Sequence, residues 1–264
     1  MLFLLKITIT PVLVALMSLA ARRWGPTIGG LVMGLPWMTG PILYFLGLER
    51  GEAYAADVAV GVLVGTICIG AYIAVFAYVA KHAPWFICLS CAALTYMVTG
   101  YATSKLGLSL WVAAMSAAAS LLLAFLITPR VKDAGGLRVL PWWDIPARML
   151  GTAMLVAFIT FSADHLGPEL SGIVATYPVI LTIVATFTHA QWGWRAAVQL
   201  ARGVSLSLLS FVAFFLVVGS MAESIGLVWS FVLATLAALL ISSLLIFFSQ
   251  RRRPAEPQSV KAAD

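Results

Sequence analysis

Residues 58–80, VAVGVLVGTICIGAYIAVFAYVA, form the stretch that decides the fold, because none of them carries a charge. Asp57 precedes the stretch and Lys81 follows it. A helix needs about 20 apolar residues to cross the hydrocarbon core of a bilayer, which is roughly 30 Å thick. The stretch is long enough for that, and its charged neighbours mark where the chain returns to water. It therefore predicts a membrane-spanning helix.

Eight more charge-free runs lie on either side of it. Two of them are short, and Lys6 can lengthen the first by extending its side chain to the interface. The composition agrees, since 62% of the residues are hydrophobic and only 10% are charged, against about 25% charged in a soluble domain. We therefore expect an all-α polytopic membrane protein with nine transmembrane helices, and we exclude a soluble fold, a nucleic-acid-binding protein and an outer-membrane barrel. The runs are 7–21, 24–48, 82–104, 106–129, 149–163, 170–194, 203–222 and 224–250.

The signs of the charges predict the orientation. The segment 251–264 is rich in Lys and Arg, and basic segments remain in the cytoplasm. Counting back through nine helices then places the N-terminus outside. Most other Lys and Arg residues fall on the cytoplasmic side in this arrangement, and most acids fall on the external side. We expect a multi-pass protein of a bacterial-type cytoplasmic (inner) membrane, with the lipid bilayer as its partner and an oligomeric state open between monomer and homodimer.

The two halves of the chain align when Thr10 is placed on Thr152, and we call this displacement the repeat offset. The alignment runs without a gap from Thr10 to Val62, and 16 of these 53 positions are identical. Shared Gly and Pro residues carry the argument, because each marks a backbone geometry rather than hydrophobicity. They are Gly25-Pro26 with Gly167-Pro168, Gly30 with Gly172, Pro36 with Pro178, Gly51 with Gly193 and Gly61 with Gly203.

The duplication predicts four parts. They are a first four-helix repeat (1–105), a connecting helix with a cytoplasmic linker (106–147), a second four-helix repeat (148–250) and a basic tail (251–264). One helix between two four-helix units turns the second unit upside down. Inverted repeats of this kind are common in secondary transporters, where they provide two pseudo-equivalent conformations.

The segment from Ile28-Gly29-Gly30 through Pro36 to Glu49-Arg50-Gly51 resembles the small four-helix bacterial inner-membrane proteins of the GlpM-like family. The counterpart from Ser171-Gly172 to Pro178 is similar, although Gln191-Trp192 replaces Glu49-Arg50. The resemblance covers the second and third helices of each half. It implies a fused, inverted pair of such units and suggests an association with exopolysaccharide production, without a settled activity.

Proline residues at matching places in the two halves predict a binding site. Proline frees a backbone carbonyl in a membrane helix, and a neighbour, a water or a ligand must satisfy it. Matched broken helices point to a site near the middle of the membrane, while the alternative interpretation is a packing kink. The candidate binding residues are Thr10, Pro36, Thr39, Gly40, Thr152, Pro178, Thr182 and Arg202.

Charged and titratable residues near the helix ends are candidates for the mouths of a pathway. Lys6 and Arg148 occupy equivalent positions, and each precedes a threonine by four residues. The alternative interpretation is that such bases only anchor helix ends at the interface. The candidates for gating or mouth charges are Lys6, Asp57, Arg148, His189 and Arg195.

Several classes of chemistry lack a sequence signal. The three cysteines lie in hydrophobic runs, and the pair Cys88-x-x-Cys91 has no second ligand pair, so packing is favoured over metal or redox chemistry. No acid lies inside a charge-free run, which disfavours a mid-membrane carboxylate carrier. We expect no enzymatic activity, no cofactor and no metal.

These patterns favour a transporter. We expect a secondary transporter or exporter that moves a small solute, anionic or amphipathic, by alternating access between inverted repeats. Two alternatives stay open. A passive channel predicts a continuous polar pore, whereas a non-transporting accessory subunit for envelope polysaccharide or lipid processes predicts a packed centre and an exposed apolar lateral groove.

Overall fold

The computed structural model describes residues 2–131, 141–165, 173–174 and 176–251, and it describes side chains over the same ranges except 2–7, 163–165 and 249–251. The described chain is all-helical, as the charge-free runs predict. The helices are α1 (Leu2–Trp24), α2 (Pro26–Met33), α3 (Thr39–Arg50), α4 (Glu52–Val79), α5 (Trp85–Ser104), α6 (Leu110–Ile127), α7 (Asp144–His165), α9 (Val179–Trp192), α10 (Trp194–Ile225) and α11 (Leu227–Arg251).

Six of the described helices are long and apolar enough to cross a membrane. They are α4, α5, α6, α7, α10 and α11, and α9 is a shorter apolar helix. These helices therefore agree with the membrane protein that the composition predicts. The count of nine crossings stays a prediction. The predicted tail after residue 251 and most of the predicted linker lie outside the described residues.

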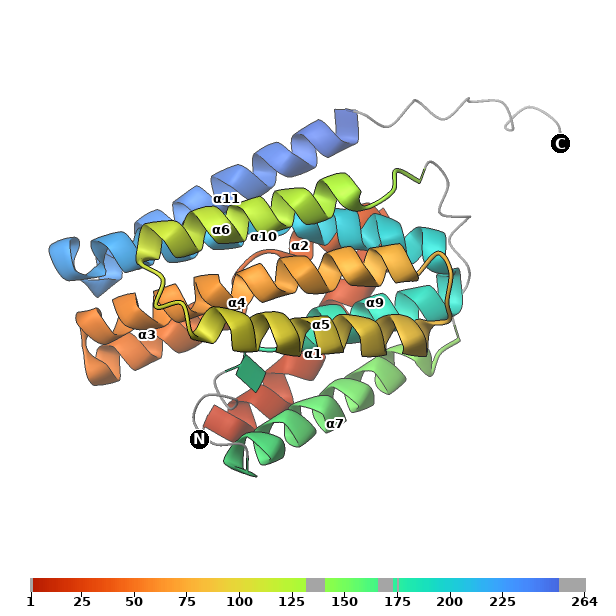
Figure 1. Ribbon diagram of the computed structural model, residues 1–264, viewed down its shortest axis with the longest axis horizontal. Helices are drawn as coiled ribbons and strands as arrows, with labels where there is room; N and C mark the ends of the chain where they lie inside the picture. Colours follow the sequence, from red (N-terminus) through yellow and green to blue (C-terminus); the bar gives the residue numbers. More distant parts are fainter. Residues whose placement is uncertain (1, 132–140, 166–172, 175, 252–264) are drawn as a thin grey trace, which may run out of the picture.

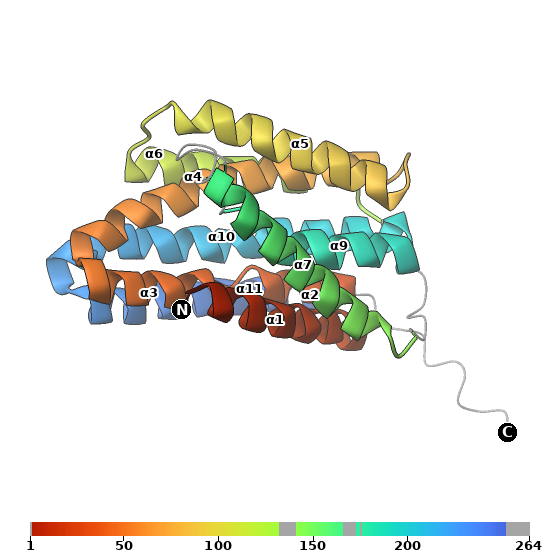
Figure 2. The ribbon, with the colours of Figure 1, turned by 90° about the horizontal axis from the view of Figure 1, so that it is seen from below.

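The two longest helices, α4 and α10, form the centre of the bundle (Figures 1 and 2). They pack against each other and both contact α6; α4 also contacts α3 and α5, and α10 also contacts α2, α9 and α11. Helices α1 and α7 pack together along one edge, and α11 lies at the opposite edge (Figure 1). This arrangement leaves α1, α7, α9 and the α2–α3 segment grouped around the middle of α4 and α10.

Helix boundaries recur at the repeat offset. Helices α1, α4 and α5 begin at residues 2, 52 and 85, and α7, α10 and α11 begin at residues 144, 194 and 227. Gly51 separates α3 from α4, and Gly193, at the equivalent position, separates α9 from α10. The two glycines have nearly the same backbone angle, φ 94° and 86°. Only glycine adopts that region without strain. Among the described helices, α6 has no counterpart at this offset.

The apolar run 24–48 is interrupted between α2 and α3, at residues 34–38. Pro36 has no N–H to donate to the carbonyl of Val32, four residues before it. The indole N–H of Trp37 donates to that carbonyl instead, at 2.9 Å. The matching break precedes α9, which begins directly after Pro178. The predicted break at Pro36 is therefore confirmed, and at Pro178 the described residues show that α9 begins directly after the proline.

Small residues allow α2 to lie directly against α10. A Cβ on Gly30 would sit 2.5 Å from the carbonyl oxygen of Leu200, and one on Gly34 would overlap Ser207. Ser207 donates a hydrogen bond to the carbonyl of Gly30 at 2.9 Å. The carbonyl of Gly30 is thus paired with a side chain of α10, and that of Val32 with Trp37, as a membrane-embedded break requires.

Helix α7 begins earlier than the charge pattern indicates. The charge-free run starts at residue 149, and the charge pattern places residues up to 147 in a cytoplasmic linker, yet α7 starts at Asp144. Asp144 begins the helix and Arg148 lies one turn later, and both are buried. The charges mislead here because Asp144 and Arg148 pair with each other and with groups from α1 and α9, so they do not mark the water boundary.

Candidate functional site

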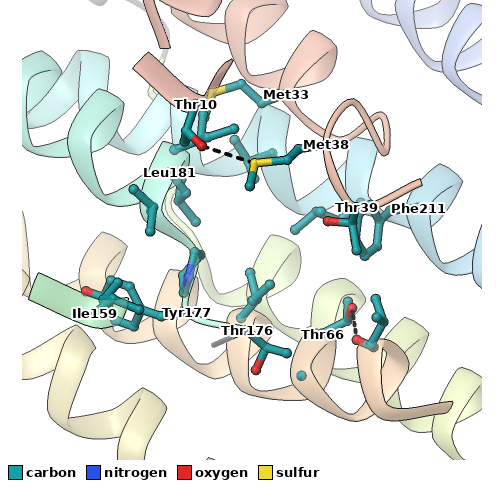
Figure 3. A pocket seen from close by; sticks show the side chains of 18 of the residues that line it. Thr10, Met33, Met38, Thr39, Thr66, Ile159, Thr176, Tyr177, Leu181 and Phe211 are labelled. Carbon is teal, nitrogen blue, oxygen red and sulfur yellow. Dashed lines mark hydrogen bonds between the residues drawn. The ribbon is translucent and has the colours of Figure 1, made fainter. Parts of the chain in front are cut away.

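A cavity of about 320 Å³ lies between the two helix breaks, at the middle of α4 and α10. Figure 3 shows side chains from both breaks pointing into it. The lining is mostly aliphatic with several hydroxyls and two thioethers, and none of the lining residues is charged. It comprises Thr10, Met33, Met38, Thr39, Val62, Gly65, Thr66, Ile69, Val156, Ile159, Thr160, Thr176, Tyr177, Pro178, Val179, Ile180, Leu181, Val204, Leu208 and Phe211.

Two threonines offer the most available hydroxyls. Thr10 on α1 is 2% exposed, and within the described chain its hydroxyl bonds only to the thioether of Met38, at 3.1 Å. Sulfur is a weak acceptor, so a ligand oxygen or nitrogen would be a stronger partner for this hydroxyl. Thr39 begins α3 and lies beside Phe211 in Figure 3. Its hydroxyl makes no hydrogen bond with any other part of the described chain.

The other lining threonines are committed to the protein. Thr66 and Thr160 donate to the carbonyls four residues before them, at 2.8 Å each. Thr176 lies 2.8 Å from the hydroxyl of Tyr96. Bonds of this kind satisfy a hydroxyl inside a membrane helix without a ligand. Thr10 and Thr39 therefore mark the polar side of the cavity.

The two breaks contact the central helices in matching ways. Gly34, in the first break, lies against Ser207 of α10, and Thr176, in the second, lies against Gly65 of α4. These two contacts are related by the repeat offset, with the partners exchanged. In each contact a glycine faces a larger residue, so both breaks approach the central helices closely.

The predicted binding residues are divided among several places. Thr10, Thr39 and Pro178 line the cavity. Thr152 and Thr182 are buried outside its lining: Thr152 donates to the carbonyl of Arg148 at 2.6 Å, and Thr182 bonds to the hydroxyl of Tyr72 at 3.1 Å. The structure therefore brings together only part of the predicted set.

Three predicted residues lie away from the cavity. Pro36 and Gly40 line a separate apolar groove of about 670 Å³ between α3 and α11. Arg202 donates to the carbonyls of Phe125 and Thr128 and lies over the Phe125 ring. It therefore fastens the end of α6 to α10, and it is neither on the cavity wall nor in the groove.

A buried ion pair lies on α7, at the end of the bundle where α1 ends. Asp144 is fully buried and Arg148 is 2% exposed, and the guanidinium Nε donates to the carboxylate at 2.9 Å. Arg22 of α1 also pairs with this carboxylate. A buried charge is stable only when it is paired and hydrogen-bonded, and the additional partners come from α1 and α9.

We name this group the Arg148 cluster. Arg148 donates to Ser18 at 3.4 Å and to the Gln191 side-chain oxygen at 3.1 Å, and its guanidinium lies 5.0 Å from the centre of the Phe187 ring. The Gln191 amide also donates to Asp144. The cluster thus joins α1, α7 and α9, and its members are Ser18, Arg22, Asp144, Arg148, Phe187 and Gln191.

The other candidate mouth residues are not part of the cluster. Asp57 and Arg195 are exposed, and Arg195 lies over the Trp194 ring. His189 is half-buried, lies 3.1 Å from the carbonyl of Ala80 and contacts the Phe76 ring. The side chain of Lys6 lies outside the described residues. Of the candidate mouth charges, only Arg148 has a buried ionic partner in the described part of the chain.

Sequence reasoning missed most of the Arg148 cluster. The charge pattern places Asp144 in the linker, and it gives no reason to select Ser18, Arg22, Phe187 or Gln191. One signal was available, because Asp144 and Arg148 are four residues apart, which is the spacing of a helical ion pair. The contribution of α9 had no such signal, since Gln191 is 43 residues from Arg148.

No protein-family model, curated protein or solved structure matches this chain. The likeness to the GlpM-like family therefore stays a prediction. The assignment of function depends on the cavity, the helix breaks and the Arg148 cluster.

Proposed function

We propose that this chain is a secondary transporter that moves a small amphipathic solute by alternating access between inverted repeats. The observation that carries the proposal is the central cavity, which lies where two broken helices meet. Matched breaks in two halves are a typical location for a transport site, because unwound backbone and adjacent side chains can bind a solute there.

Inverted topology is supported by the ends of the helices. The turn at Gly51 joins α3 to α4, and the turn at Gly193 joins α9 to α10. They are equivalent in the sequence alignment and lie at opposite ends of the bundle in both views (Figures 1 and 2). In this proposal the chain crosses the membrane nine times, with α2 and α3 forming one broken crossing.

The lining indicates the substrate class. A cavity of about 320 Å³ without a charged lining residue disfavours a fully charged solute, since burying an unpaired ion costs far more than burying a neutral group. The aliphatic and thioether groups suit an apolar body, and Thr10 and Thr39 suit one neutral polar group. Of the two classes expected from sequence, the amphipathic solute is therefore favoured over the anionic one.

The accessory-subunit alternative is favoured by one observation. The groove between α3 and α11 is lined almost entirely by apolar side chains and faces outward, with Phe45 57% and Leu236 59% exposed. An exposed lateral groove of this kind suits a lipid chain or another membrane protein. It is one of the two features that this second function predicts; the central cavity is at odds with the other, a packed centre.

A matched pair of substitutions tests both functions. Thr39→Phe fills the cavity, and Thr235→Phe, on α11, fills the groove by the same change. Small molecules are compared inside and outside cells that express the wild type, either variant or no protein, after size-exclusion chromatography shows that each variant is folded. Transport predicts that only Thr39→Phe abolishes the difference made by the wild type. Loss with Thr235→Phe alone would support the accessory role.

A further inference from the structure

We infer that the Arg148 cluster is the gate of the transport pathway at its own end of the bundle, and that it is closed in this structure. This inference rests on the proposed alternating access. It assigns a role to a buried polar group that the solute site does not use. The cluster joins α1, α7 and α9, which are three of the helices that line the cavity.

The cavity extends away from the cluster. On α1 only Thr10 lines it, and on α7 the lining residues are Val156, Ile159 and Thr160. Ser18 and Arg148 are each eight residues from the nearest of these, which corresponds to about 12 Å along a helix. The interval is filled by buried side chains, including Val14 and Thr152, both 0% exposed. The pathway is therefore sealed on the cluster side.

Repeat symmetry predicts what the opposite conformation must expose. Across the repeat offset, the residues equivalent to Val156, Ile159 and Thr160 are Val14, Met17 and Ser18. These three are now buried, at 0%, 4% and 1% exposure. In the exchanged conformation they would line the cavity. Ser18 is held by Arg148 in the present conformation, so the cluster has to separate before the opposite state can form.

The chemistry of the cluster suits a gate. Its buried charges and hydrogen bonds connect separate helices, and such interfaces switch between discrete arrangements instead of deforming gradually. Removing one partner of a buried pair leaves the other charge uncompensated, which strongly disfavours the closed arrangement. Weakening the cluster should therefore shift the population toward the state that is open at this end.

Met17 and Ile159 provide matched reporters, because they are equivalent residues on the two sides of the cavity. Each is changed to Cys in a full-length chain whose three native cysteines are replaced by Ala, and is labelled in oriented membrane vesicles with a charged, membrane-impermeant maleimide. Asp144→Asn should raise labelling of Met17→Cys from the cluster side at least tenfold and lower labelling of Ile159→Cys from the other side by a similar factor.

Arg202→Gln is the matched control. Arg202 is a half-buried arginine that also joins two helices, but its partners are the carbonyls of Phe125 and Thr128 at the end of α6. It should leave both labelling rates within twofold of the wild type. If Asp144→Asn does not yield folded protein, Gln191→Ala removes the hydrogen bonds from α9 and keeps the Arg148–Asp144 pair. We then expect about a threefold rise in labelling of Met17→Cys. Unchanged labelling in a folded cluster variant would overturn the gate.

The labelling needs no substrate, so it separates the gate from the proposed function. Unchanged rates together with loss of transport in Thr39→Phe would refute the gate and leave the transporter standing. Opposite changes at the two reporters would support the gate even if Thr39→Phe had no effect on any solute. A rise at both reporters together would show a continuous pore and would overturn the gate as an alternating device.

Discussion

The hydroxyls of Tyr72 and Thr182 form a buried hydrogen bond of 3.1 Å between α4 and α9. The residues at equivalent positions, Phe214 and Gly40, also lie together, because a Cβ on Gly40 would be 3.3 Å from the Phe214 ring. Helix α9 is therefore joined to the central helix α4 by a hydrogen bond, whereas α3 is joined to the central helix α10 by an aromatic ring packed against glycine. The two contacts occupy equivalent positions but differ in chemistry.

We expect Tyr72→Phe to destabilise the protein modestly. It leaves the ring in place and removes one buried hydrogen bond, which is worth about 0.6–1.5 kcal/mol inside a membrane helix bundle. The measurement is the midpoint of thermal unfolding in detergent. Phe76→Leu is unsuitable as a control because that ring stacks with Tyr72, so Tyr78→Phe, at a residue that is 65% exposed, is used instead. A larger drop in the unfolding midpoint of Tyr78→Phe than of Tyr72→Phe would contradict the prediction.

Two glycine substitutions should change the stability of the protein in opposite directions. Gly30→Ala places a methyl group 2.5 Å from the Leu200 carbonyl, and overpacking of this kind costs about 1–3 kcal/mol. Gly151→Ala meets only Ile183 at 3.6 Å and gains up to about 1 kcal/mol of helix propensity. Unfolding midpoints of the two variants, compared in one detergent, check this. Equal midpoints would mean that α2 does not pack on α10 as described.

Trp37→Phe tests the break at Pro36. The substitution removes the indole donor to the Val32 carbonyl, so we expect a loss of about 1 kcal/mol in unfolding free energy. The control is Trp111→Phe on α6, where the ring is 62% exposed. An equal loss in the two variants would argue against the proposed pairing.

Reporter fusions test the inverted topology. An enzyme that is active only outside the cytoplasm is fused after Gly51 or after Gly193, which are equivalent residues at opposite ends of the bundle. We expect activity at Gly51 and none at Gly193, with a cytoplasmic reporter giving the reverse pattern. Parallel repeats would place both fusions on the same side of the membrane and would refute the inverted arrangement.

Much of the helical framework could be predicted from the sequence. Charge-free runs locate the helices, because an apolar segment of sufficient length has a stable place only in a bilayer or a protein core. Pro36 and Pro178 predict the two breaks from local chemistry, since proline removes a donor wherever it occurs. The repeat offset predicts which helices share boundaries. Each of these signals is local or repeated along the chain.

Only the tertiary structure decided which polar groups face the cavity and which are paired elsewhere. Thr10 and Thr152 are equivalent in sequence, yet Thr10 lines the cavity and Thr152 bonds to a backbone carbonyl. Arg148 reads as an interface anchor until Asp144 and Gln191 are placed beside it. A charge in a sequence marks the water boundary only if no distant partner neutralises it. Asp144 is on the same helix as Arg148, but Ser18 and Gln191 come from other helices, so their arrangement depends on packing that the linear pattern does not contain.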